Sequence, residues 1–284
     1  MTGALRLLAL AALAACLTGP ASAQRVLAPS FPTGGGVAYF DVVVYGSEPE
    51  GIMAAVAAAE EGARTLMVTA DARLGGLFVL GELNMLDMRT QPFNYQRGLF
   101  QRWWRMVGAM DAFDVPVAER AFQRMLADAG VELWTEAGQV APRYGDGVLR
   151  GIELTDLGVE VNALQVTDAS ADADLAAQTD APFDLGWERF GVSQRQADTL
   201  VLNVAGVDWQ ALRRGGSARG RGYANMRETV AWGSFGGVPT AYVPSRPDVR
   251  LRGLNLGLQN DGSVLVHALL LYGLDPPDPA SLSH

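Results

Sequence analysis

The stretch Asp41–Gly76, DVVVYGSEPEGIMAAVAAAEEGARTLMVTADARLGG, carries the pattern that decides the fold. It begins with an apolar run at Asp41–Tyr45, which is typical of a parallel strand covered on both faces. The run ends in a short segment that begins with Gly46 and closes with Gly51. We therefore expect a buried strand that leads into a glycine turn.

A helix and a second strand are predicted after this turn. Ile52–Glu61 is rich in alanine and poor in β-branched residues, which favours a helix, and Gly62 is placed to end it. Thr65–Thr69 is then expected to form the second strand. Strand, glycine turn, helix and strand within about 30 residues is the context in which a glycine fingerprint indicates a dinucleotide-binding βαβ unit.

The turn residues suit that chemistry. Gly46 permits a tight turn, and Gly51 lets the helix pack closely on the strand. Pro49 is tolerated in the first helical turn, because its missing N–H would have no helical partner. Ser47 and Glu50 complete the turn. The free N–H groups at the start of the helix are expected to face a pyrophosphate.

Two positions depart from the fingerprint. Glu48 stands where the second glycine is expected, and Thr69, 23 residues after Gly46, replaces the acid that binds ribose hydroxyls. Two orientations of Glu48 are open. Pointing to solvent, its charge would stabilise the helix through the macrodipole. Pointing inward, about 6 Å from a phosphate, it would cost roughly 3 kcal/mol at an effective dielectric constant near 20.

The motif VVVYGSEPEGIMAAVAAAEEGA, followed by RLGG, resembles the start of the FAD-dependent oxidoreductases of the glutathione-reductase-like type. In the most similar branch a small polar residue followed by proline often replaces the middle glycine. The resemblance extends through VAERAFQRMLADAGVELWTEAGQV (Val117–Val140) and VTDASADADLAA (Val166–Ala177), and more weakly through NDGSVLVHALLLYGLDPPDPASL.

The resemblance implies FAD as the cofactor and assigns further residues to its site. Arg73 and the pair Gly75-Gly76 would lie closest to the pyrophosphate, unless these glycines only supply a turn with positive φ. Val140 would contact the adenine through its backbone. The tripeptide Asp168, Ala169 and Ser170 would close over the cofactor.

The implied fold is α/β: a Rossmann-like βαβ FAD-binding domain with an antiparallel β-meander insertion and a second, partial substrate-facing lobe. We expect a signal peptide at 1–23, a linker at 24–40, the FAD-binding domain at 41–181 and the substrate-facing domain at 182–284. The family continues with a last strand and helix after the position of His284, so we expect the second domain to be incomplete.

Several further elements are expected. Leu99–Met110 is predicted to be a helix whose Trp103 and Trp104 either pack in the core or stack on a flavin. The other predicted elements are a helix at Val117–Ala129, ended by Gly130, strands at Val131–Thr135, Gln139–Ala141, Val148–Leu154, Val159–Asn162, Leu164–Val166, Leu200–Val204 and Val264–Leu271, and a flexible loop at Arg213–Arg221.

The N-terminus has the features of an export signal. Arg6 precedes the apolar segment Leu7–Leu17, and Ala21-Ser22-Ala23 is a cleavage motif of the A-x-A form. Three outcomes are open: cleavage after Ala23, a lipoprotein whose Cys16 is lipidated, and an uncleaved anchor. The first gives a periplasmic or secreted protein that begins at Gln24, and only the other two place it at a membrane.

Composition excludes several kinds of chemistry. The net charge of −9, from 22 basic and 31 acidic residues, and the lack of a basic stripe argue against nucleic-acid binding. The sequence contains no lysine, which excludes a Walker-A loop and a pyridoxal Schiff base. With one cysteine and two histidines, no metal site is predicted. A cofactor such as a flavin is therefore expected to supply the chemistry.

The expected function is hydride transfer between flavin and an unidentified small-molecule substrate. The alternative is a catalytically degenerate Rossmann-like binding protein or remnant. No catalytic residue is assigned: His267 and Tyr272 are the conventional acid–base candidates, but both lie in a strand-like segment that favours core packing.

The acidic run Asp168–Asp184 lacks the central glycine and final glutamate of an EF-hand, so we interpret it as a solvated loop with a helix at Ala173–Gln178. The oligomeric state stays open.

Overall fold

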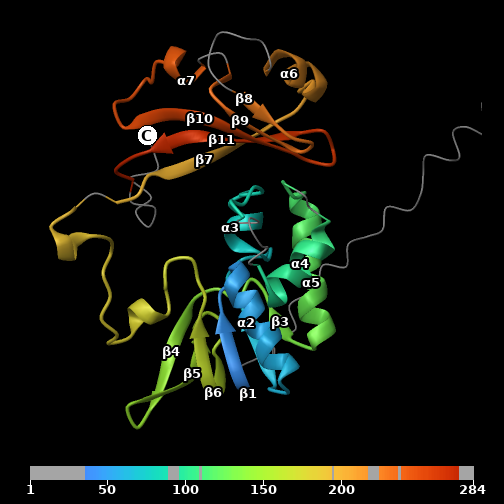
Figure 1. The fold of residues 1–284 in the computed structure, drawn as a ribbon. Helices are drawn as coiled ribbons and strands as arrows, with labels where there is room; N and C mark the ends of the chain where they lie inside the picture. Colours follow the sequence, from blue (N-terminus) through green and yellow to red (C-terminus); the bar gives the residue numbers. More distant parts are fainter. Residues whose placement is uncertain are drawn as a thin grey trace, which may run out of the picture. The chain divides into compact units, whose positions relative to one another are not determined.

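The computed structural model describes residues 36–88, 96–108, 111–193, 195–216, 224–235 and 238–274. Figure 1 shows two sheets, one in each half of this chain. The signal-peptide prediction, most of the predicted linker and the proline-rich C-terminal residues lie outside the described ranges.

The first sheet has six strands in the order β3-β2-β1-β6-β5-β4. Four of them run parallel, and the antiparallel β5 and β4 extend the sheet beyond β6. This is the predicted α/β fold with a β-meander. The strands are β1 (Gly36–Tyr45), β2 (Thr65–Val68), β3 (Glu132–Trp134), β4 (Val140–Gly145), β5 (Val148–Leu154) and β6 (Val159–Asp168).

The structure differs from the predictions along the paired strands β1 and β6. The segments Val159–Asn162 and Leu164–Val166 are one continuous strand, because β1 pairs along it from Gly36 with Val159 to Tyr45 with Asp168. The same pairing draws Gly36–Phe40, the end of the predicted 24–40 linker, into the sheet.

Three helices of this half, α2 (Pro49–Glu60), α4 (Gly98–Val107) and α5 (Val115–Ala129), lie close to the predicted positions. The short helix α3 (Gly76–Val79) has no counterpart among the predicted elements. Asp114 caps α5, since its side chain accepts a hydrogen bond from the Val117 N–H at 3.0 Å. Gly130 ends α5 in the left-handed conformation, with φ at 76°.

The main core forms between these helices and one face of the sheet. Trp103 of α4 is fully buried, and its ring stacks on Phe122 of α5 with centroids 4.9 Å apart. Ile52 and Val56 of α2 belong to the same cluster. Of the two roles open for Trp103, core packing is therefore the correct one.

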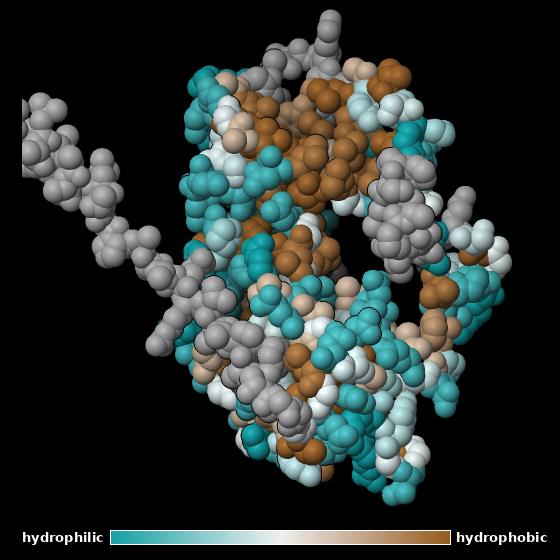
Figure 2. Space-filling model, turned by 180° about the vertical axis from the view of Figure 1, so that it is seen from behind, coloured by the Kyte–Doolittle hydropathy of each residue, from teal (hydrophilic) through white to brown (hydrophobic). Residues whose placement is uncertain are grey.

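The second sheet is antiparallel, in the order β7-β11-β10-β9-β8, and the strands predicted at Leu200–Val204 and Val264–Leu271 are both present in it. Trp209 of α6 packs on one face, against Ala231, Leu256 and Val264. In Figure 2 hydrophobic residues gather over this half of the molecule. Its elements are β7 (Asp198–Val204), α6 (Trp209–Gly216), β8 (Ala224–Met226), β9 (Val230–Gly233), α7 (Val238–Ala241), β10 (Val249–Leu258) and β11 (Val264–Leu271).

Two other predictions need correction. Arg213 and Arg214 of the predicted Arg213–Arg221 loop belong to the last turn of α6, and residues 217–221 lie outside the described ranges. The helix predicted at Ala173–Gln178 is a single 3-10 turn, η1 (Ala176–Gln178), and a second such turn, η2 (Glu188–Phe190), follows it.

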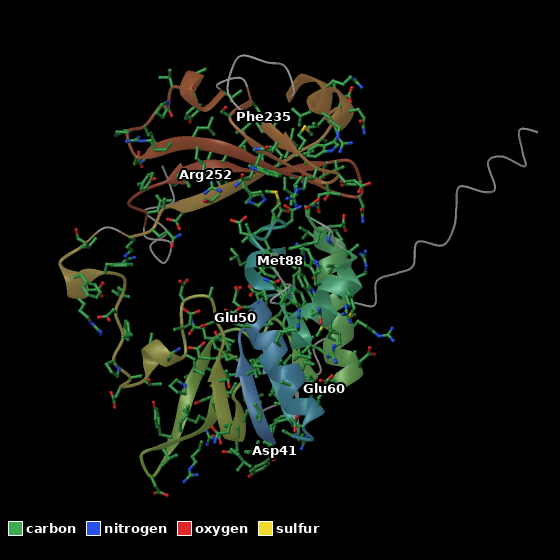
Figure 3. All side chains as sticks on the ribbon, viewed as in Figure 1. Asp41, Glu50, Glu60, Met88, Phe235 and Arg252 are labelled. Carbon is green, nitrogen blue, oxygen red and sulfur yellow. The ribbon has the colours of Figure 1, made fainter. Side chains whose placement is uncertain are left out.

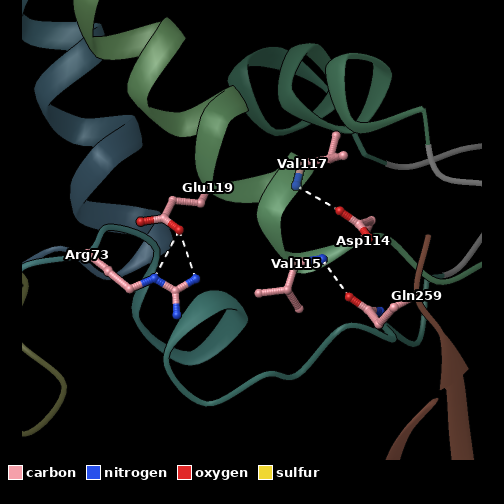
Figure 4. A network of polar contacts seen from close by, with 6 residues as sticks. All are labelled: Arg73, Asp114, Val115, Val117, Glu119 and Gln259. Atoms are coloured by element: carbon pink, nitrogen blue, oxygen red, sulfur yellow. Dashed lines mark hydrogen bonds and ion pairs between the residues drawn. The ribbon is translucent and has the colours of Figure 1, made fainter. Parts of the chain in front are cut away.

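The hairpin between β10 and β11 is hydrogen-bonded to the start of α5 (Figure 4). The Val115 N–H donates to Gln259 Oε1 at 2.9 Å. The Asn260 N–H donates to Asp114 Oδ2 at 3.0 Å, so this carboxylate caps α5 with one oxygen and holds the hairpin with the other. Within the described ranges no helix has the length and hydrophobicity needed to cross a membrane.

Candidate functional site

The glycine turn after β1 packs directly against the end of β6. Gly46 has φ at +98°, and a Cβ atom there would overlap the backbone of Ala169 and Ser170. A Cβ on Gly51 would lie 2.5 Å from the Ala169 Cβ. The Ala169 N–H donates to the Tyr45 carbonyl at 2.7 Å, which fixes this approach. Both glycines are thus required by close packing at the carboxyl ends of two adjacent parallel strands.

The start of α2 lies at this turn. Glu48 is the N-cap residue, with an extended backbone at φ −61° and ψ 153°, and Pro49 opens the helix. Figure 3 shows that Glu50 and Glu60 lie at opposite ends of α2. Because the first N–H groups of a helix have no helical acceptor, the N–H groups of this end are available to an anion.

The side chain of Glu48 crosses from the turn to the loop that follows β2. Its Oε2 accepts a hydrogen bond from the Leu77 N–H at 2.9 Å. Its carboxylate occupies the space that a Cβ atom on Gly76 would need. The Gly75 N–H donates to the Ser47 carbonyl at 3.0 Å, so the turn and the loop are also joined through their backbones.

The pKa of Glu48 is raised above its usual value. Burial is the largest cause, and the negative charges of Glu50, Asp71 and Asp172 add to it, while the hydrogen bond from Leu77 acts in the opposite direction. Because its carboxylate bonds to the Leu77 N–H and lies against Gly76, Glu48 takes the inward one of the two orientations open from the sequence.

Thr69, the residue that follows β2, is buried and neutral. Its Oγ1 lies 3.4 Å from both Ser47 Oγ and Asp71 Oδ2, and it accepts a hydrogen bond from the Asp71 N–H at 3.1 Å. The carboxylate beside Thr69 is that of Asp71, two residues further along. No role for Asp71 is predicted from the sequence. The signal that could have found it is an acid just beyond the strand end.

Asp168 uses its carboxylate to order the segment that follows β6. One oxygen accepts from the Ser170 N–H at 3.0 Å and from the Ser170 hydroxyl at 2.7 Å. The other accepts from the Ala176 N–H at 2.6 Å. Burial, with Asp174, Asp168 and Asp71 nearby, raises the pKa of Tyr45. Asp168 thus orders the turn at Asp168–Ser170 and is one of the acids that raise the pKa of Tyr45.

Arg73 and Val140 each bond to another residue of the chain. Arg73 donates to Glu119 of α5 through Nε at 3.0 Å and Nη2 at 2.8 Å (Figure 4). The Val140 carbonyl accepts from Gln178 Nε2 at 3.1 Å. The structure therefore gathers the other twelve predicted site residues around one turn: Gly46, Ser47, Glu48, Pro49, Glu50, Gly51, Thr69, Gly75, Gly76, Asp168, Ala169 and Ser170.

His267 lies in β11, where its Nε2 is 3.3 Å from Oδ1 of the fully buried Asn84. Burial, helped by the charge of Arg252, lowers the pKa of His267 to about 4, so the ring is neutral at pH 7. Tyr272 is exposed beyond the end of β11. Within the described part of the chain, no cluster of three or more His, Cys, Asp or Glu residues could hold a metal ion.

Comparison with protein families gives one match, and it covers most of the chain. Residues 41–263 match the model of the family described as FAD dependent oxidoreductase. The chain belongs to this family. FAD is accordingly its cofactor, as the sequence motifs predict. Among curated proteins no match is found.

Solved structures similar to this chain share little sequence with it. A geranylgeranyl bacteriochlorophyll reductase-like protein from Thermoplasma acidophilum is 16% identical, with a TM-score of 0.46 over 82% of this chain and 57% of its own. Glycine oxidase from Bacillus cereus is 10% identical, with a TM-score of 0.46 over 82% and 72%. An FAD dependent oxidoreductase from Pseudomonas aeruginosa is 12% identical, with a TM-score of 0.44 over 84% and 68%. The family assignment rests on the family match, not on these likenesses.

The site of this family member fits FAD in its backbone and departs in two side chains, Glu48 and Thr69. The contacts of Gly46 and Gly51 with Ala169 form the tight turn that a pyrophosphate needs at the start of a helix. The Glu48 carboxylate, by contrast, places a negative charge beside that turn. The backbone of the turn thus fits the cofactor, and the Glu48 side chain beside it is only partly buried.

Proposed function

We propose that the protein is an FAD-dependent oxidoreductase that transfers a hydride between the flavin and a small-molecule substrate. The observation that carries the proposal is the close packing of the Gly46–Gly51 turn on Ala169, within a chain whose residues 41–263 match the family. When bound, FAD supplies the hydride chemistry through its flavin ring.

The chain's own residues would bind and orient the cofactor. The N–H groups at the start of α2 would hold the pyrophosphate, and Asp71 would accept from the ribose hydroxyls in place of an acid at Thr69. The turn at Asp168–Ser170 would close one side of the site. The second sheet lies within the proposed substrate-facing domain 182–284 and would border the substrate.

The experiment that tests the proposal is a titration of the apo-protein with FAD and with NAD, followed by the absorbance of the purified complex. We expect a yellow protein that binds FAD more tightly than NAD. If FAD does not bind at millimolar concentration, the enzyme hypothesis fails, and a degenerate Rossmann-like binding protein explains the fold better.

We also propose that the protein is exported and matures at Gln24. The support is the basic start, the short apolar segment and the Ala21-Ser22-Ala23 motif. The intact mass of the protein from its native host tests this, since a diacylated or triacylated form beginning at Cys16 has a different mass.

A further inference from the structure

Glu48 is held in a defined position at the centre of the proposed cofactor site. It bonds to the Leu77 N–H at 2.9 Å, and its carboxylate lies against Gly76, where any larger residue would overlap it. The chain on both sides is tied down, by the Ser47–Gly75 backbone bond before it and the helix start at Pro49 after it. The contacts with Leu77 and Gly76 therefore define the position of the carboxylate.

The surroundings of Glu48 do not neutralise its charge. Among the described residues, the groups that act on it electrostatically are Glu50 from α2, Asp71 from the loop after β2 and Asp172 from the segment after β6, and all three are acids. A backbone N–H is its hydrogen-bond partner. The carboxylate is thus held by a backbone donor, the kind of group that also binds phosphate oxygens.

We propose that the Glu48 carboxylate occupies the place of a ligand phosphate between the glycine turn and α3, so that FAD binds only by displacing it. This inference rests on the proposed function. It makes Glu48 a residue that sets cofactor affinity: its charge opposes the pyrophosphate, and its side chain must leave Leu77 before the phosphate can enter.

Protonation of Glu48 then favours binding, because the neutral carboxyl group no longer repels the pyrophosphate. The raised pKa brings this protonation closer to neutral pH. FAD affinity is therefore expected to increase as the pH falls through the pKa of Glu48.

The test compares ligands that differ only in phosphates. FAD is paired with riboflavin, and ADP with adenosine, in calorimetric titrations of the wild type, Glu48→Gln and Glu48→Ala. We expect both variants to bind FAD and ADP roughly 10- to 100-fold more tightly, and riboflavin and adenosine with little change. Glu61→Gln is the matched control, because this exposed acid lies at the opposite end of α2, away from the glycine turn.

A second measurement needs no cofactor. The backbone amide shift of Leu77, followed by NMR, should titrate with pH in the wild type and not in Glu48→Gln. In parallel, the pH dependence of FAD affinity should be lost in this variant.

The outcomes separate the two hypotheses. If FAD binds with the same affinity to the wild type and to both Glu48 variants, the displacement idea is overturned and the proposed function stands. Weaker binding by the variants also overturns it, because the carboxylate then helps to hold the ligand. If neither FAD nor ADP binds any form, the proposed function itself fails.

Discussion

The contact between Gly51 and Ala169 gives a stability prediction that can be worked from the structure. Replacing Gly51 by alanine adds a methyl group 2.5 Å from the Ala169 Cβ, about 1 Å closer than ordinary contact. Overpacking of this kind costs about 1–3 kcal/mol. Alanine within a helix gains about 1 kcal/mol over glycine, so we expect Gly51→Ala to lower the free energy of unfolding by about 0–2 kcal/mol.

The partner substitution isolates the contact. Ala169→Gly alone removes a buried methyl group and adds backbone freedom, at a cost of about 1–2 kcal/mol. In the double variant the overlap between the two Cβ atoms is removed, and alanine at position 51 still stabilises the helix relative to glycine. We therefore expect the double variant to be at least as stable as Ala169→Gly, which corresponds to a coupling energy of about 1–3 kcal/mol.

Urea unfolding of the four forms measures these free energies. Gly62→Ala is the matched control: a Cβ atom there meets open space, but φ is +93°, so it should cost about 1–2 kcal/mol and show no coupling with Ala169→Gly. A Gly51→Ala variant that is more stable than the wild type and uncoupled from position 169 would refute the close packing of α2 on β6. The case for a dinucleotide turn would then lose its main support.

Three further predictions concern other parts of the chain. The wild type should lose stability as the pH falls from about 6.5 towards 4, because His267 takes up a proton in the unfolded chain but stays neutral in the folded chain. Urea unfolding over this pH range should show a smaller loss for His267→Gln. An equal dependence of the unfolding free energy on pH in both proteins would contradict the low pKa of His267. Asp114→Ala should cost about 1–3 kcal/mol, since it removes both the cap of α5 and the acceptor for the Asn260 N–H, and a change below about 0.5 kcal/mol would show that neither bond contributes. Mass spectrometry of the protein from its host should give a chain that begins at Gln24, and an acylated Cys16 would overturn that expectation.

The sequence predicts the local elements of the fold well because their signals are local. The apolar run before Gly46, the alanine-rich helix and the stop at Gly130 each depend on neighbouring residues, and α2, β2 and α5 begin and end near the predicted positions. The split predicted within β6 has no breaker residue to support it. Pairing with β1 along its whole length, a long-range effect, keeps that strand continuous.

The site is less predictable because its side chains bond to residues that are distant in the sequence. Arg73 was expected beside a pyrophosphate, yet its guanidinium pairs with Glu119, 46 residues later in the chain. The fingerprint also shows that Glu48 is unusual but not which way it points. That depends on Gly76, whose missing side chain leaves room for the carboxylate.

The bond between the Val115 N–H and Gln259 has a consequence for how the chain is made. The acceptor is translated 144 residues after the donor, which at 5–20 residues per second is a delay of roughly 7–30 s on the ribosome. During that interval α5 can form on its own cap, Asp114, but its first N–H group has only water as a partner. The half of the nascent chain that contains α5 therefore has the start of this helix uncovered until the hairpin between β10 and β11 leaves the exit tunnel.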